Sequence, residues 1–171
     1  MKNENMKALC VLMASCIGVS ALMAAVNSFT KPIIKEIEIQ KVQESLMVVM
    51  PDGRHFVEVG TDGLDDAVKE AYVAENGGYV FKVVVTGYAS GMTVMCGIDA
   101  QGVVTGACCI ASGETLEAEK KYGDNFVGMT GDGVDGVDTV SGATLTTKAY
   151  KNAVNKAFDA FEKLTGGTHN E

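Results

Sequence analysis

The pattern of apolar and polar positions separates an uncharged segment near the N-terminus from the mixed remainder of the chain. Residues 8–29 contain no charged side chain and consist mainly of Leu, Val, Met, Ala and Ile. At about 1.5 Å per residue, a helix of this length spans roughly 33 Å, enough for one membrane crossing. We therefore expect an uncleaved membrane anchor over residues 1–30. A cleaved signal peptide is the alternative, although no Ala-x-Ala site follows the apolar segment.

The charges beside this segment do not fix its orientation. Lys2 and Lys7 precede it, and Lys31 and Lys35 follow it. The excess of positive charge that marks the cytoplasmic side of a membrane helix is therefore missing. Residues 31–50 continue with helical spacing and predict a helical stalk that ends at Pro51. The apolar positions of this stalk are Ile33, Ile34, Ile37, Val42 and Leu46.

Residues 51–165 have the pattern of one α+β domain, with residues 166–171 as a flexible tail. Short β-branched segments alternate with glycine-containing turns, and residues 79–110 predict an antiparallel meander. Residues 68–74 fit either a helix or a strand. The last helix is predicted by apolar residues at 3.6-residue spacing that begin at Leu145. Its stripe continues through Ala149, Ala153, Val154, Ala157, Phe158, Phe161 and Leu164.

Composition excludes some classes of function. The net charge of −8 and the lack of a basic cluster argue against nucleic-acid binding. Five cysteines without a Cys-x-x-Cys motif argue against a disulfide framework or a zinc site, so we interpret Cys108 and Cys109 as core residues. The aspartates of residues 131–138 resemble a calcium loop. The twelfth residue from Asp132 is Ala143 instead of the required Glu, so we predict a flexible acidic segment and no metal site.

The segment Asp138-Thr139-Val140-Ser141-Gly142-Ala143-Thr144-Leu145-Thr146 precedes the last helix directly. Unpaired backbone N–H groups and the positive end of the helix dipole favour an anion at such a position. Gly142 and Ala143 allow a ligand to approach the backbone closely. A simple helix cap by Ser or Thr explains the same residues equally well. The residue pattern alone leaves these two interpretations open.

The pattern Asp-x-x-Ser-Gly-Ala-Thr-x-Thr, together with Thr86-Gly87-Tyr88 before a strand, resembles the FMN-binding domain family. This family includes the G subunit of the Rnf electron-transport complex and the C subunit of the sodium-pumping NADH:quinone reductase. The resemblance implies that Thr144 carries FMN through a phosphoester bond, and that Ser141, Gly142 and Ala143 shape the phosphate turn. It also implies that a flavin transferase installs the FMN and reads Asp138.

The family often has Glu-Thr-Pro-Gly-Leu-Gly at a loop that contacts the flavin. Glu114 and Thr115 match the start of this motif, whereas the Pro and Gly residues are absent. The resemblance thus implies flavin contacts from Glu114 and Thr115 within a loop of different shape. We expect these residues to open a short polar helix that ends at Tyr122.

The resemblance implies a single-pass membrane protein with an extracytoplasmic domain, in which FMN relays electrons between other membrane subunits of an ion-translocating ferredoxin:NAD oxidoreductase. Such a protein transfers electrons and needs no catalytic acid or base. The chain length fits the Rnf protein better than its longer quinone-reductase counterpart. Two further hypotheses are an anchored flavoprotein that supplies a separate reductase and an anchored binding module without flavin.

Overall fold

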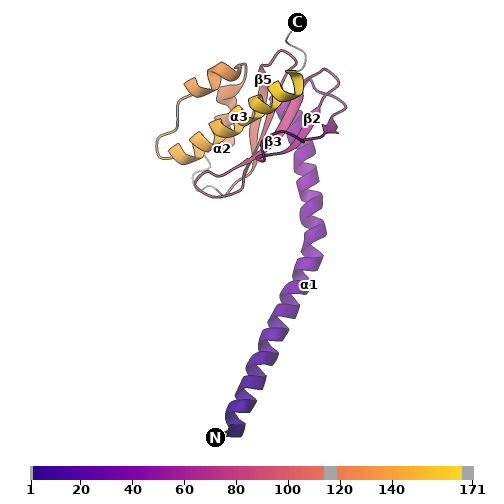
Figure 1. Ribbon diagram of the computed structural model, residues 1–171, viewed down its shortest axis with the longest axis vertical. Helices are drawn as coiled ribbons and strands as arrows, with labels where there is room; N and C mark the ends of the chain where they lie inside the picture. The colour runs from indigo at the N-terminus through magenta and orange to yellow at the C-terminus, as the bar shows by residue number, and fades with distance from the viewer. Residues whose placement is uncertain (1, 114–118, 167–171) are drawn as a thin grey trace. The chain divides into compact units, whose positions relative to one another are not determined.

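The computed structural model describes residues 2–113 and 119–166. The chain begins with one long helix, α1 (Lys2–Val49), and continues with five strands, two short 3-10 helices and two further helices (Figure 1). By its internal contacts the chain divides into two units, with the boundary between Lys41 and Val42. This boundary lies inside the predicted stalk, so the last two turns of α1 belong to the folded domain.

The first unit is helical throughout its described part. Residues Val11–Ser28 have a mean hydropathy of 1.8, and none of these residues is buried, so this segment is long and apolar enough to cross a membrane. The hydroxyls of Ser15 and Ser28 donate to the carbonyls of Leu12 and Ala24 at 2.8 and 3.0 Å. These bonds satisfy polar groups within the helix itself. As predicted, α1 continues through the stalk, and it ends at Val49, two residues before Pro51.

The second unit is built on a five-stranded antiparallel sheet in the order β1-β2-β3-β4-β5. The strands are β1 (Val57–Val59), β2 (Val68–Val73), β3 (Tyr79–Val85), β4 (Met92–Ile98) and β5 (Val104–Ala111). The predicted meander of residues 79–110 is confirmed, and residues 68–73 form a strand. Gly77 and Gly102 adopt positive φ angles of 80° and 78° in the two tight turns, a conformation that favours glycine.

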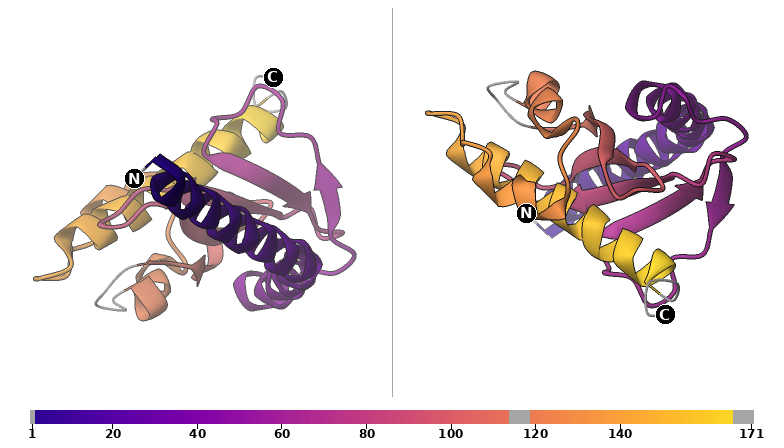
Figure 2. Two further views of the ribbon diagram at one scale, coloured as in Figure 1. Left: turned by 90° about the horizontal axis from the view of Figure 1, so that it is seen from below. Right: turned by 90° about the horizontal axis from the view of Figure 1, so that it is seen from above.

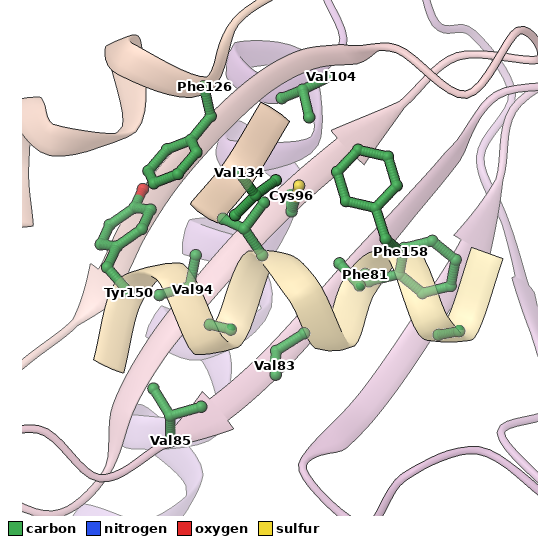
Figure 3. Close-up of a cluster of buried hydrophobic side chains, with 14 of the residues drawn as sticks. Phe81, Val83, Val85, Val94, Cys96, Val104, Phe126, Val134, Tyr150 and Phe158 are labelled. Atoms are coloured by element: carbon green, nitrogen blue, oxygen red, sulfur yellow. The ribbon is translucent and has the colours of Figure 1, made fainter. Parts of the chain in front are cut away.

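Both faces of the sheet are covered, which explains why every residue of β4 is buried. Helix α3 (Thr144–Thr165) packs on one face, against Val94 and Cys96 among others (Figure 3). The last turns of α1 pack on the opposite face, where Leu46 and Val49 meet Met95. Figure 2 shows α3 along its side of the strands. Alternate side chains of one strand therefore enter two separate cores.

The end of α1 lies directly on the sheet backbone. Gly97 of β4 pairs with Gly106 of β5, and a Cβ on either residue would lie within 2.6–2.7 Å of the Val49 backbone. The Thr105 hydroxyl donates to the Val49 carbonyl at 2.6 Å. Two paired glycines therefore create the space that the end of the helix occupies.

Three short helices connect β5 to α3. They are α2 (Glu119–Tyr122), η1 (Gly123–Phe126) and η2 (Gly131–Gly136). The predicted polar helix before Tyr122 is present over its last four residues, whereas residues 114–118 lie outside the described part of the chain. Gly123 approaches β5 so closely that an added Cβ would clash with the Ala107 carbonyl oxygen. This contact joins the connecting segment to the sheet.

Four cysteines in the described part of the chain are free. Cys96 is completely buried, and burial raises the pKa of its thiol to about 12. Cys108 and Cys109 are half-buried, and both pack against core residues. Burial also raises the pKa of the Cys108 thiol. A raised pKa keeps the reactive thiolate of Cys108 scarce, which agrees with the prediction that this residue serves packing.

Candidate functional site at the N-terminus of α3

Thr144 is the first residue of α3, and the cap position before it is Ala143. No side chain makes a capping hydrogen bond at this helix end. The interpretation of the Ser-Gly-Ala-Thr segment as a simple Ser or Thr cap is therefore wrong, because alanine carries no oxygen to accept from the first-turn N–H groups. The first turn keeps its N–H groups and the positive end of the helix dipole directed at the space before it.

The turn before α3 is tight and open to solvent. The Ala143 N–H donates to the Val140 carbonyl at 3.0 Å. Gly142 has φ +84°, which an L side chain rarely adopts, and no heavy atom lies within 4 Å of a Cβ built on it. Ser141 is exposed, whereas Ala143 is buried. The turn thus needs glycine for its backbone angle and leaves free space beside the helix end.

The threonines of the first turn have different environments. The buried Thr147 hydroxyl lies 3.0 Å from the Ala143 carbonyl and 3.3 Å from that of Thr144. Thr146 is also buried. Thr144 is exposed, and no hydrogen bond in the described part of the chain uses its hydroxyl. Of these three threonines, Thr144 is therefore the exposed one.

Leu145 contradicts the predicted stripe of α3. The structure confirms the buried positions from Ala149 to Phe161, but Leu145 is 61% exposed. Thr146 and Thr147 occupy the buried side of the first turn instead. Val140, on the other side of Thr144, is also exposed. Two apolar side chains near Thr144 in the sequence are therefore exposed, while the two threonines that follow Leu145 are buried.

The acidic segment before the turn is fixed by side chains from two helices. The Lys151 ammonium of α3 donates to the carbonyls of Asp135 and Val137 at 2.8 and 2.9 Å. The Tyr122 hydroxyl donates to the Asp138 carbonyl at 2.8 Å. The segment that was predicted to be flexible therefore includes the 3-10 helix η2, and three of its backbone carbonyls accept side-chain hydrogen bonds. No described group of His, Cys, Asp or Glu side chains there is arranged to hold a metal ion.

An aromatic cluster joins the start of α3 to the short helices before the acidic segment. Tyr150 of α3 stacks on Phe126 at 5.7 Å between ring centroids, and Tyr122 meets both rings edge-on. Burial, followed by the nearby Asp138 carboxylate, raises the pKa of Tyr122. Its hydroxyl therefore stays protonated and continues to donate to Asp138. The Tyr150 hydroxyl is buried without a hydrogen-bond partner in the described structure (Figure 3).

The N-terminus of α3 lies at the end of the sheet where β3 finishes. Figure 3 shows Tyr150, near the start of α3, on the side of Val85, and Phe158 on the side of Phe81. The loop from Thr86 to Gly91, which follows Val85, is therefore at the same end. Gly113 also reaches this loop, because a Cβ on Gly113 would lie 3.2 Å from Ala89.

The structure brings Ser141, Gly142, Ala143 and Thr144 together in one exposed turn. Glu114 and Thr115 lie outside the described part of the chain. Sequence reasoning missed Lys151 and Tyr122, because their partners are backbone carbonyls that leave no pattern in the sequence. The sequence shows only that Lys151 lies in the predicted last helix, and a lysine is common on the exposed face of any helix.

The turn fits a phosphate-linked group. Its hydroxyl is exposed, its glycine leaves open space, and the helix N-terminus provides N–H donors for phosphate oxygens. A phosphodiester on Thr144 would carry one negative charge, and Lys151 would offset part of the acidic character of the preceding segment.

Comparison with known proteins identifies the class of this domain. Residues 87–159 match the profile of the FMN-binding domain family, and this range includes the whole segment from Asp138 to Thr147. The chain therefore carries a domain of the FMN-binding domain family. It is also similar to the G subunit of the Na(+)-translocating ferredoxin:NAD(+) oxidoreductase complex of Acetobacterium woodii. The two are 25% identical, and the alignment covers 92% of this chain and 91% of the relative.

Proposed function

We propose that this chain is a membrane-anchored flavoprotein that carries FMN on Thr144 through a phosphoester bond. The observation that carries the proposal is the exposed Thr144 hydroxyl at the first residue of α3, inside the family-matched region. Attachment joins the hydroxyl oxygen to the phosphate, so the net addition is one FMN less one water. The bond prevents loss of the cofactor outside the cell.

The residues of the turn have separate roles in this proposal. Backbone N–H groups of the first turn of α3 stabilise the phosphodiester charge. Gly142 leaves room for the phosphate, while Ser141 and Ala143 complete the turn. Asp138 is read by the flavin transferase, and its backbone is fixed by Tyr122. Glu114 and Thr115 contribute flavin contacts from the neighbouring segment.

The proposed role is electron relay within an ion-translocating oxidoreductase complex of the ferredoxin:NAD type. The similarity to a component of a complex of that name supports this role. When bound, FMN supplies reversible electron transfer, so the chain itself needs to hold and orient the cofactor. The partners are other membrane subunits of the complex.

The N-terminal segment supports a single-pass location. Val11–Ser28 is apolar, and none of it is buried within the chain, as expected of a segment surrounded by lipid. We propose that it anchors the protein in the cell membrane with the domain on the extracytoplasmic side. Labelling of cysteines placed on the domain in intact cells tests this side, and labelling only after lysis would contradict it.

Attachment is tested by expressing the full chain with a flavin transferase. Wild type is compared with Thr144→Ala and with Thr139→Ala, which removes another exposed threonine of the same segment. We expect in-gel flavin fluorescence from wild type and Thr139→Ala, and none from Thr144→Ala. A colourless wild type beside a modified control substrate would favour a binding module without flavin.

A second experiment separates the relay from an anchored flavoprotein that supplies an independent reductase. The flavinylated protein is purified in mild detergent from its native membranes. A relay protein is expected to co-purify with multi-span membrane proteins in a fixed ratio. Isolation of the flavoprotein alone, under conditions that keep other membrane complexes intact, would favour the independent role.

A further inference from the structure

The first turn of α3 reverses the usual distribution of polar and apolar side chains. Thr146 and Thr147 are 5% and 0% exposed, whereas Leu145 between them and Thr144 is 61% exposed. Val140 is 43% exposed on the other side of the attachment residue. Burial of an apolar side chain stabilises a folded protein, so the apo domain forgoes this contribution at both positions.

Neither side chain belongs to a core of the described structure. The cluster beneath α3 starts with Ala149 and Tyr150 and includes Val137 at its edge, but it contains neither Val140 nor Leu145. Their positions are nevertheless fixed. Leu145 lies in the first turn of α3, and the Val140 carbonyl accepts the hydrogen bond that closes the turn. The two residues therefore present exposed apolar side chains from a fixed backbone, one before and one after Thr144 in the chain.

An apolar surface beside a covalent attachment point favours the attached group as its occupant. FMN has a charged phosphate at one end of a flexible ribityl chain and a largely apolar ring system at the other. The helix N-terminus suits the phosphate, and the ring system then needs an apolar contact within reach of the chain. Val140 and Leu145 provide exposed apolar side chains close to Thr144 in the chain, because Val140 lies four residues before it and Leu145 directly follows it.

We infer that Val140 and Leu145 form a contact surface for the isoalloxazine ring of the FMN on Thr144. This inference rests on the proposed attachment. The contact limits rotation of the ring about its ribityl chain and shields one side of it from water. A ring that is held in one orientation exchanges electrons with its partners over defined distances.

The direct test is time-resolved fluorescence anisotropy of the flavinylated full chain in detergent. A ring held on this surface depolarises mainly with the slow tumbling of the protein. A ring that rotates freely loses most of its anisotropy in a fast phase. A predominantly fast decay in the wild type would overturn the inference, even though attachment itself is intact, and this result requires no variant.

Variants then identify the surface. Leu145→Ser and Val140→Ser are compared with the control variant Val127→Ser. Val127 is also exposed (53%), but it lies at the opposite end of the sheet, because the N–H of the next residue, Gly128, donates to the Val104 carbonyl at the start of β5. We expect the first two variants to enlarge the fast anisotropy phase and to increase iodide quenching at least twofold, and the third to match wild type.

The outcomes separate this inference from the proposed function. Intact mass reports attachment, whereas anisotropy and quenching report the ring. Equal anisotropy and quenching in all four flavinylated proteins would overturn the ring contact and leave attachment in place. A wild type that never gains FMN would overturn the proposed function first. If Leu145→Ser is not flavinylated, Val140→Ser and the wild-type decay still decide the result.

Discussion

The two ends of α3 differ in the burial of their apolar side chains. At the C-terminal end, Phe158 and Phe161 are buried, and Phe161 meets Tyr79 of β3 edge-on at 5.8 Å between ring centroids. At the N-terminal end, Leu145 is exposed and two threonines are buried. One helix therefore packs as the hydrophobic pattern predicts along most of its length and departs from it within one turn.

This difference agrees with the site proposed at the first turn of α3. The C-terminal end follows the pattern because the only requirement there is to cover the sheet. The first turn of α3 and the residues directly before it include an exposed threonine, an uncapped helix end and a glycine at positive φ, none of which strengthens the apo fold. Local departures from packing rules concentrate at functional sites. The family match over the same residues agrees with this interpretation.

The largest effect on stability is expected at the C-terminal end. Phe158→Ala removes a buried aromatic ring and should lower the free energy of unfolding by about 3–5 kcal/mol. Leu145→Ala, the matched change at the other end, should stay within about 0.5 kcal/mol because the side chain is exposed. Urea unfolding of the apo protein, followed by tyrosine fluorescence, measures both. Equal losses would contradict the contrast between the two ends.

The lysine that fixes the acidic segment should have the next largest effect. Lys151→Met removes two charge-assisted bonds to the Asp135 and Val137 carbonyls, with an expected loss of about 1–3 kcal/mol. Amide hydrogen exchange across residues 131–138 should rise by at least tenfold. Lys148→Met, on the exposed side of the same helix, is the control and should leave this exchange unchanged.

A third comparison separates the threonines of the first turn. Thr147→Val removes a buried hydroxyl that lies within hydrogen-bonding distance of the Ala143 carbonyl, so we expect a loss of about 0.5–1.5 kcal/mol. Thr144→Val should be nearly neutral in the apo protein, because its hydroxyl is exposed and makes no described hydrogen bond. Thermal unfolding of the two variants tests this order. A larger loss for Thr144→Val would give that hydroxyl a structural role.

The sequence predicts the architecture well where a pattern repeats along the chain. The apolar segment, the meander and the stripe of α3 from Ala149 onward all follow from local periodicity, and the motif places Thr144 at the helix start. The exposure of Leu145 could not be predicted, because periodicity assigns it to the buried stripe. Only the three-dimensional fold shows that Thr146 and Thr147 occupy the buried side.

Contacts between distant backbone groups were equally invisible in the sequence. Gly97 and Gly106 make room for the Val49 backbone, but as isolated glycines in strands they indicate only a bulge or a close approach. Lys151 and Tyr122 donate hydrogen bonds to backbone carbonyls. Because every residue has such a carbonyl, the sequence does not identify the partner. The covalent chemistry itself was suggested by resemblance and not by periodicity, because physical reasoning alone left a helix cap as an equal alternative.

The smallest expected effect concerns pH at the C-terminal half of α3. Lys156 pairs with Asp65, and this hydrogen bond holds the pKa of the Asp65 carboxyl below its ordinary value of 3.8. The contribution to stability is therefore complete above pH 3.8 and is lost as the pH falls through the lower folded value. Asp65→Asn should flatten the stability profile below about pH 4. An unchanged acid profile would show that the pair contributes nothing measurable.

Localisation of the flavin within one peptide tests the central claim most directly. Trypsin cleaves after Lys121 and Lys148, and the peptide between these sites contains five threonines, namely Thr130, Thr139, Thr144, Thr146 and Thr147. Tandem mass spectrometry of the wild type, expressed with a flavin transferase, is expected to place one FMN less one water on Thr144. FMN on another residue, or an unmodified peptide beside a modified control substrate, would contradict the account.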